Sequence, residues 1–146
     1  MNFITKTFQE LTIDELYKIL QLRSEVFVVE QDCVYQDIDF KDQKALHVFG
    51  AINNQIIAYT RIFKPGDYFD NASIGRVVVE KNERTSGYGV DVMEASIKAV
   101  ENHFNTTKIT ISAQVYLTKF YNSLGFKKVG EEYLEDGIPH IKMIKN

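Results

Sequence analysis

The spacing of hydrophobic residues changes twice in the first third of the chain. Residues 3–8 alternate weakly between apolar and polar and predict a strand, and Thr12 with Glu15 forms a capping box that predicts the start of a helix. This helix is expected over about residues 13–27. Its apolar residues near one face are Leu16, Ile19, Leu20 and Leu22. Residues 28–45 are polar without a clear period and predict a loop or a broken short helix.

The middle of the chain predicts a hairpin, a further strand and the most regular helix. Two β-rich runs at 47–53 and 55–63 meet at Asn53 and Asn54. Asparagine tolerates the positive φ of a tight turn, so these runs are expected to pair antiparallel. Residues 73–80 predict the next strand. A helix is expected after residue 89 from apolar residues at spacings of three and four: Val90, Met93, Ile97, Val100 and Phe104.

The last third of the chain predicts a buried strand, a helix and a hairpin. Residues 108–113 read as the strand, and apolar residues recur at helical spacing over 115–124. Gly125 suits the left-handed residue that ends a helix. Two strands, about 126–134 and 139–144, flank an E-D-G turn. Because antiparallel hairpins mix with one strand–helix–strand crossover, the sequence predicts an α/β (α+β) fold with a mixed sheet and helices on its faces.

Length, composition and charge describe an ordinary globular protein. The chain has 146 residues, of which 45% are hydrophobic and 25% charged, so residues 1–146 are expected to form one domain. The net charge of -3 gives no overall attraction for nucleic acid or for an anionic membrane. No apolar run approaches the roughly 20 residues that span a bilayer, and the N-terminus lacks the apolar core of a signal peptide. We therefore expect a cytoplasmic protein without nucleic acid or membrane partners.

Cysteine and histidine are few and far apart. Cys33 is the single cysteine, and His47, His103 and His140 do not have the spacing of zinc ligands. The sequence therefore predicts no bound metal. Cys33 resembles a nucleophile only by residue type, since nothing in the sequence places a histidine beside it, and an inert thiol is expected.

A glycine-bearing segment, R-T-S-G-Y-G at residues 84–89, joins a predicted strand to a predicted helix. At a helix start the first four amides lack intrahelical partners and the dipole is positive, so an anion is a natural ligand. Gly87 and Gly89 would let a pyrophosphate approach the backbone, and Arg84 could add a charge-assisted contact. The alternative is that the glycines only permit a tight connection. The segment lacks the G-K-[ST] of a Walker A loop, and Val92 stands where G-x-G-x-x-G needs a third glycine.

Two segments together resemble a known family. V-E-K-N-E-R-T-S-G-Y-G, from Val79, resembles the acetyl-CoA signature V-x-x-x-x-[QR]-x-x-G-x-[GA] of the Gcn5-related N-acetyltransferases (GNAT). Q-V-Y-L-T-K-F-Y-N-S-L-G-F is similar to the family's second segment, with Gln114 in place of asparagine and Leu117 in place of alanine. Residues 22–42 and 135–143 resemble the ElaA-type branch. The resemblance implies a mostly antiparallel sheet of about six to seven strands flanked by about four helices.

The resemblance also implies acetyl-CoA as co-substrate. Its pyrophosphate would lie on the amides of the glycine-bearing segment, and its pantetheine arm would bond to backbone groups of Val77 and Val79 beside a bulge. The valine side chains themselves are expected to pack as ordinary core. Thr85 stands where many members have glycine. This difference does not remove the backbone amides of residues 84–89. The implied cofactor-binding residues are Val77, Val78, Val79, Arg84, Thr85, Ser86, Gly87, Tyr88, Gly89, Val90 and Gln114.

The implied reaction is direct attack of a neutral amine on the thioester. Tyr121 occupies the family's position for a general acid, and a tyrosine with an unperturbed pKa of about 10 is protonated at neutral pH. The alternative for Tyr121 is an aromatic core residue. Only about one part in a thousand of a lysine-like ammonium is neutral near pH 7.4, so a base or a water relay is needed. Glu30, His47 and Glu80 are candidates for the base, and the sequence does not choose among them.

The acceptor amine is expected in the region of residues 26–37. The candidate acceptor-binding residues are Glu30, Gln31, His47 and Arg76. Arg76 lies among apolar residues of its strand, so it borders the acceptor site or forms an internal ion pair. The expected partner is a small-molecule or peptide amine, bound by a monomer or homodimer. Two other functions stay open: a non-catalytic CoA-binding sensor or docking module, and a nucleotide-dependent phosphotransferase, which the missing P-loop lysine disfavours.

Overall fold

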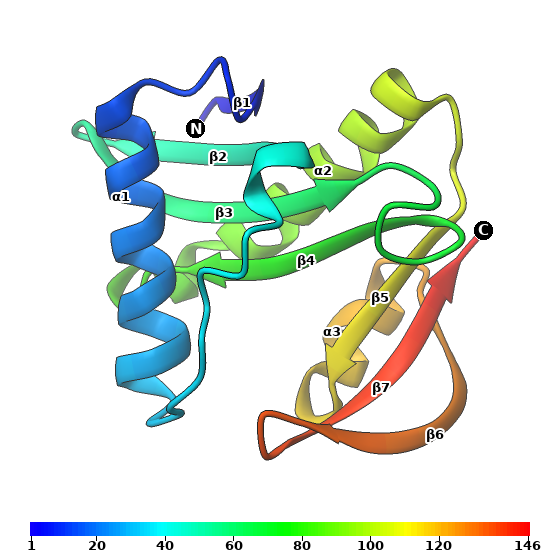
Figure 1. Ribbon diagram of the computed structural model, residues 1–146. Helices are drawn as coiled ribbons and strands as arrows, with labels where there is room; N and C mark the ends of the chain where they lie inside the picture. The colour runs from blue at the N-terminus through cyan, green and yellow to red at the C-terminus, as the bar shows by residue number, and fades with distance from the viewer.

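A seven-stranded mixed sheet forms the centre of the computed structural model, which describes residues 1–146 (Figure 1). The strand order is β1-β2-β3-β4-β5-β7-β6, and only the β4–β5 pair is parallel. The strands are β1 (Phe3–Thr7), β2 (Leu46–Ile52), β3 (Gln55–Phe63), β4 (Ala72–Val79), β5 (Ile109–Gln114), β6 (Lys127–Glu135) and β7 (Ile138–Lys145). The expected mixed, mostly antiparallel sheet is confirmed.

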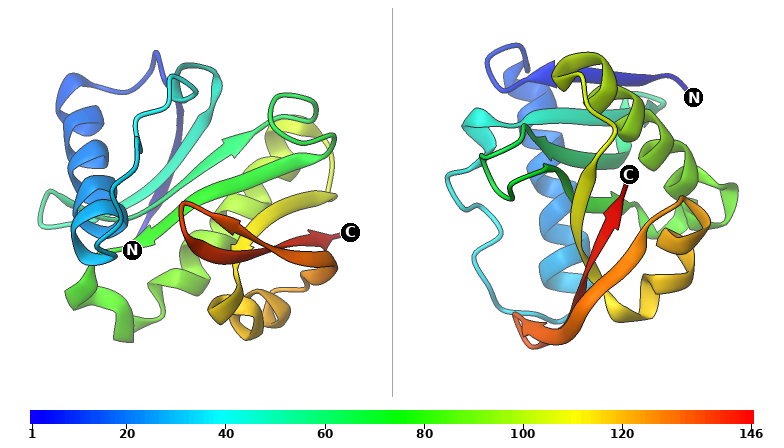
Figure 2. Two further views of the ribbon diagram at one scale, coloured as in Figure 1. Left: turned by 60° about the horizontal axis from the view of Figure 1, so that its bottom comes forward. Right: turned by 90° about the vertical axis from the view of Figure 1, so that its right-hand side faces the viewer.

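Helices cover both faces of this sheet (Figures 1 and 2). The α-helices are α1 (Ile13–Arg23), α2 (Tyr88–Phe104) and α3 (Thr118–Ser123). A π-helix spans Ser24–Glu30, and short 3-10 helices span Asp42–Lys44, Lys81–Ser86 and Val115–Leu117. The larger hydrophobic core joins α2 to the sheet, and a smaller one joins α1 and the π-helix to the other face. No helix is long and apolar enough to cross a membrane.

Local sequence signals explain several of these elements. The capping box is present at the start of α1: Thr12 Oγ1 accepts from the Glu15 backbone N–H at 3.0 Å, and Glu15 Oε1 accepts from that of Thr12 at 2.9 Å. Asn53 and Asn54 both have positive φ, 50° and 66°, in the β2–β3 turn. Gly125 has a φ of 93° after α3. The predicted helix start, hairpin turn and helix end are confirmed at these positions.

The first predicted helix was wrong in its end and in its type. The α-helix ends at Arg23, and the chain continues as a π-helix to Glu30. The wider turn is visible in backbone bonds that span five residues, from Gln31 N–H to the Val26 carbonyl at 3.2 Å and from Cys33 N–H to the Val28 carbonyl at 3.1 Å. A pattern read with a period of 3.6 residues does not detect such a turn. Short π-helical turns occur frequently at functional sites.

The sheet forks between β4 and β5. These strands pair only at their beginnings, Ala72 with Ile109 and Ser73 with Thr110, and then separate (Figure 1). On its other side β4 pairs with β3, and β4 carries one extra residue there. Arg61 pairs with Gly75 and Tyr59 pairs with Val78, so two steps along β3 match three steps along β4. Such an insertion bends a strand and increases its twist. The bulge therefore accounts for the departure of β4 from β5.

Candidate active site

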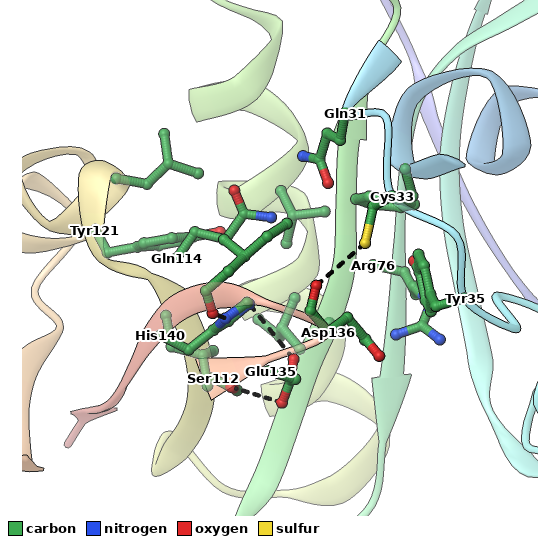
Figure 3. A pocket seen from close by; sticks show the side chains of 17 residues that line it. Gln31, Cys33, Tyr35, Arg76, Ser112, Gln114, Tyr121, Glu135, Asp136 and His140 are labelled. Atoms are coloured by element: carbon green, nitrogen blue, oxygen red, sulfur yellow. Dashed lines mark hydrogen bonds and ion pairs between the residues drawn. The ribbon is translucent and has the colours of Figure 1, made fainter. Parts of the chain in front are cut away.

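Two cavities lie at this fork. The larger has a volume of about 340 Å³. The smaller has a volume of about 100 Å³ and extends from β4 toward the β6–β7 turn (Figure 3). Because several residues line both, the two cavities adjoin each other. The residues that line both are Phe27, Gln31, Val77, Gln114, Leu117 and Tyr121.

The backbone of Val79 faces the larger cavity. Its neighbour Glu80 donates its backbone N–H to the Ile57 carbonyl of β3 at 2.7 Å. Hydrogen-bonding groups of successive residues point to opposite edges of a strand, so those of Val79 point away from β3. The Val79 carbonyl accepts from Arg84 Nε at 3.0 Å. This edge of β4 therefore faces the larger cavity, where a ligand would share the Val79 carbonyl with Arg84.

The glycine-bearing segment is more ordered than the predicted loop. Residues 81–86 form a 3-10 helix, so Thr85 and Ser86 lie in it, and α2 begins at Tyr88. Gly87 is the N-cap with a φ of 80°, and it provides no side chain to cap the first amides of α2. A Cβ at Gly89 would only reach ordinary contact with Phe120, at 3.5 Å. Internal packing therefore does not demand a glycine at residue 89, whose missing side chain leaves the helix start open.

Arg84 is engaged by Glu30 rather than free. Its guanidinium makes two bonds to the Glu30 carboxylate, one of them Nη2 to Oε1 at 2.8 Å. This hydrogen bonding lowers the pKa of Glu30 and raises that of Arg84. Both residues line the larger cavity. Glu30 is thus near the predicted site, but a carboxylate with a lowered pKa is poorly suited to act as a base.

The prediction that His47 binds the acceptor or acts as the base was wrong. Its ring is 0% exposed and lines neither cavity. Nδ1 lies 2.6 Å from the Tyr59 hydroxyl and Nε2 lies 2.9 Å from the Asp42 carbonyl. Burial lowers its pKa. The alternation of β2 turns this side chain into the interior, where both ring nitrogens are used for structure.

Glu80 also lies outside both cavities. Its carboxylate accepts from the Asn82 backbone N–H at 2.9 Å and caps the 3-10 helix at residues 81–86. Capping occupies the carboxylate that the sequence offered as a base. Glu80 therefore lies apart from the candidate site, as His47 does.

Arg76 forms the internal ion pair that was one alternative, and it also borders the smaller cavity. Its guanidinium lines the smaller cavity, and it also forms an internal ion pair, with Nε 2.7 Å from Asp37 Oδ1. Arg76 has a φ of 49° at the bulge of β4, an unusual value for a residue with a side chain. The pair belongs to an Arg–Asp cluster, which contains Arg23, Arg61, Arg76, Asp37, Asp39 and Asp42. This cluster fastens the segment after the π-helix to β3 and β4.

Tyr121 and Gln114 lie where the cavities meet. Tyr121 is 5% exposed, and its ring packs edge-on against Phe120 and Phe126, with centroids 5.1 and 6.1 Å away. Burial raises the pKa of Tyr121, and the nearby Tyr116 adds to this rise, so the hydroxyl keeps its proton at neutral pH. Gln114 Oε1 is buried without a hydrogen-bond partner. An unpaired buried carbonyl is costly, and a ligand N–H would satisfy it.

The smaller cavity contains polar residues that the sequence did not single out: Ser112, Glu135, Asp136 and His140 (Figure 3). They come from β5 and from the β6–β7 hairpin. Register pairs His140 with Gln114 across β5 and β7. If the pairing of β5 with β7 had been known, it would have placed His140 beside Gln114. No local signal in the sequence shows that β7, rather than β6, lies beside β5.

Cys33 also lines the smaller cavity. Its thiol donates to the Asp136 carbonyl, with a distance of 3.2 Å between Sγ and O (Figure 3). This contact ties the segment after the π-helix to the β6–β7 turn. No group of three or more His, Cys, Asp or Glu side chains is arranged to hold a metal ion.

The whole chain is similar to proteins of one family. Residues 5–146 match the family model described as an acetyltransferase (GNAT) domain. Protein ElaA of Escherichia coli strain K12 is 42% identical over 138 residues, which cover 93% of this chain and 90% of ElaA. The crystal structure of an acyl-CoA N-acyltransferase from Pseudomonas aeruginosa has a TM-score of 0.94 at 40% identity and full coverage of both chains. The crystal structure of Escherichia coli ElaA has a TM-score of 0.91 at 38% identity, again with full coverage.

Proposed function

The chain belongs to the GNAT acetyltransferase family, in its ElaA-type branch, and we propose that it transfers the acetyl group of acetyl-CoA to a primary amine of a small molecule or peptide. Family membership makes the protein an N-acyltransferase that uses an acyl-CoA co-substrate. The choice of acetyl as the acyl group, of a primary amine as acceptor and of Tyr121 as the acid belongs to the proposal.

Three features of the larger cavity and of the adjacent start of α2 support the binding of the co-substrate. The backbone of Val77 and Val79 lies along its wall, so the amide groups of the pantetheine arm can bond to β4 as an added strand would. Gln114 Oε1, buried and without a partner, can accept an N–H of the same arm. Gly87 and Gly89 leave the first amides of α2 open to the pyrophosphate.

One observation carries the proposed reaction: Tyr121 lies in the wall that the two cavities share. A thioester held in the larger cavity would meet an amine from the smaller cavity at this wall. The neutral amine attacks the thioester carbonyl, the new C–N bond forms, and the C–S bond breaks. The Tyr121 hydroxyl, kept protonated by burial, donates its proton to the departing thiolate and regains one from the acetylated nitrogen.

A thermal-shift screen with acetyl-CoA, CoA and ATP, followed by an amine panel with detection of the released thiol, tests this proposal. We expect protection by both CoA ligands, no protection by ATP, and acetyl transfer to at least one amine. Failure of both CoA ligands to protect the protein would overturn the proposal. Protection without transfer to any amine would instead support a non-catalytic CoA-binding module.

Tyr121→Phe tests the assigned acid. The variant keeps the ring contacts with Phe120 and Phe126, so we expect folding and CoA affinity like those of the wild type. The loss of the hydroxyl is expected to lower kcat by about 100-fold to 10,000-fold. Tyr17→Phe is the matched control, because Tyr17 is an exposed tyrosine on α1. A kcat within threefold of the wild type for Tyr121→Phe would exclude this role, on the scale of about 100-fold that general acid catalysis contributes.

A further inference from the structure

A chain of polar contacts runs from the smaller cavity to the surface through the β6–β7 hairpin (Figure 3). His140 Nε2 lies 3.4 Å from Glu135 Oε2, and Glu135 Oε1 accepts from Ser112 Oγ at 3.2 Å. The Ser112 hydroxyl also contacts the hydroxyl of Tyr133. The His140 side chain is 8% exposed whereas that of Glu135 is 41% exposed, so the chain of contacts begins inside the cavity and ends in solvent.

The hydrogen bond at the other nitrogen of His140 assigns its tautomer. Nδ1 lies 2.7 Å from the Ile138 backbone carbonyl, which can only accept. Nδ1 therefore carries the proton and donates it to this carbonyl, and in the neutral ring Nε2 holds the lone pair. The ring is further fixed by stacking on Tyr133, with centroids 6.2 Å apart and planes 23° apart. The nitrogen that can accept a proton is thus the one beside Glu135.

His140 and Tyr121 border the same cavity from different elements. The β5–β7 register places His140 opposite Gln114, and Gln114 lies with Tyr121 in the wall shared by the two cavities. Figure 3 draws His140, Glu135 and Ser112 below Tyr121 and Gln114. An amine in the smaller cavity therefore has a proton acceptor on one side and the proposed acid on the other.

We propose that His140 is the general base of the transfer and that Glu135 carries the proton on to solvent. This inference rests on the proposed function. The acceptor arrives as an ammonium ion, whose proton passes to His140 Nε2. The neutral amine then forms the C–N bond. Tyr121 donates its proton to the departing thiolate and regains one from the acetylated nitrogen. His140 transfers its proton to Glu135, which releases it to solvent, so that one proton leaves per acetyl group transferred.

The charged groups around His140 suit this role. Glu135 and Asp136 face the cavity from the hairpin and attract an ammonium ion. Arg76 faces it from β4, but the pairing of Arg76 with Asp37 and with Asp39 offsets its charge. The remaining titratable groups that border the cavity are Cys33, Tyr35 and Tyr121.

The experiment compares His140→Gln and Glu135→Gln with the wild type. Release of thiol from acetyl-CoA is measured from pH 6 to 9 with ethylamine and with 2,2,2-trifluoroethylamine, both small enough for a cavity of about 100 Å³. The fluorinated amine is far less basic, so it is already neutral and needs no base. CoA protection in thermal unfolding reports whether each variant is folded. His103→Gln is the matched control, because His103 is exposed in the last turn of α2 and lines neither cavity.

We expect His140→Gln to lower kcat with ethylamine by about 100-fold or more, to leave a rate that still rises at pH 9 as the neutral fraction of the amine does, and to keep CoA protection. The loss should be much smaller with trifluoroethylamine, which a purely structural role would not produce. Glu135→Gln should give a smaller loss of the same kind, and His103→Gln none.

An unchanged kcat and pH profile in His140→Gln would overturn this inference and leave the proposed function intact. An equal loss with both amines would also overturn it, since it indicates misplacement of the acceptor instead of a missing base. If His140→Gln does not fold, Glu135→Gln decides: a wild-type pH profile in that variant rejects the relay. Absence of transfer from the wild type to ethylamine rejects the base assignment, whereas absence of transfer to every amine rejects the proposed function as well.

Discussion

Asp37 is the residue whose loss should most clearly separate the acceptor side of the site from the cofactor side. Its side chain is 6% exposed and accepts from Arg23 Nε at 3.0 Å, from Arg76 Nε at 2.7 Å and from the Tyr35 hydroxyl at 3.2 Å. Asp37→Asn keeps the size of the side chain but removes the charge, and it turns one acceptor oxygen into an amide donor. That donor would then face a guanidinium or hydroxyl donor.

The expected loss of unfolding free energy depends on the ion pairs that Arg23 and Arg76 keep in the variant. Removal of one partner of a buried ion pair costs about 3–5 kcal/mol. Arg23 keeps Asp42, at 2.8 Å, and Arg76 keeps Asp39, at 3.4 Å, so we expect the lower end, about 3 kcal/mol. For a chain of this size each kcal/mol lowers Tm by about 2–4 °C. Asp37→Asn should therefore melt roughly 6–12 °C below the wild type.

The same variant should raise KM for the amine and leave CoA affinity unchanged. Arg76 and Tyr35 line only the smaller cavity, and Asp37 holds both of them. Thermal unfolding with and without CoA gives stability and cofactor affinity, and thiol release at varied amine concentration gives KM. Asp70→Asn, an exposed aspartate in the β3–β4 connection, is the control. A Tm within about 2 °C of the wild type, less than the shift for one kcal/mol, would refute the view that the two arginines depend on the charge of Asp37.

Three further outcomes follow from the charges of the site. Burial raises the pKa of Asp39, but the hydrogen bonds and charge of Arg61 outweigh this and hold it at about 2. Ionised Asp39 stabilises the fold above the pKa that an aspartate has in the unfolded chain, about 4, and this stabilisation is lost as the pH falls to about 2. The urea midpoint should therefore fall between about pH 4 and about pH 2. A constant midpoint would contradict the pairing of Asp39 with Arg61. Glu30→Gln frees Arg84 for a phosphate, so calorimetry should find CoA binding up to about fivefold tighter; weaker binding would argue against a phosphate contact for Arg84. Cys33→Ala should keep wild-type kcat, and intact mass measured after mixing with acetyl-CoA should show no acetylated enzyme; a tenfold loss of kcat would reopen the thiol as a nucleophile.

Signals carried by neighbouring residues predicted most of the fold. The capping box at Thr12 and Glu15, the Asn53–Asn54 turn and Gly125 each act over a few residues, and each is present in the structure. The π-helix was missed because its residues look helical in the sequence, and only the bond pattern separates a π turn from an α turn. Helix propensity contains no information about this difference.

The proposed base, His140, was missed for a different reason. Selecting His47 relied on residue type, but strand alternation places its ring in the interior with both nitrogens bonded. His140 and Glu135 lie near a turn that the sequence described only as a hairpin. They reach the site because β7 inserts between β5 and β6. This insertion is a pairing between strands distant in sequence, and hydrophobic alternation in a single strand does not specify the partner.

The strand order also explains why the residues of the larger cavity can be predicted from the sequence more easily than those of the smaller cavity. The larger cavity is built mainly from two continuous stretches, residues 77–89 and 114–121, which coincide with the two segments that resemble the family signatures. The smaller cavity collects side chains from four separate places, and its hairpin residues are held by β7 rather than by the β4–α2 connection. Under the proposed function, a substitution in the hairpin is therefore expected to change which amine is accepted and to leave CoA binding intact. In this architecture acceptor specificity is expected to vary at residues 135–140, while residues 77–89 preserve the cofactor.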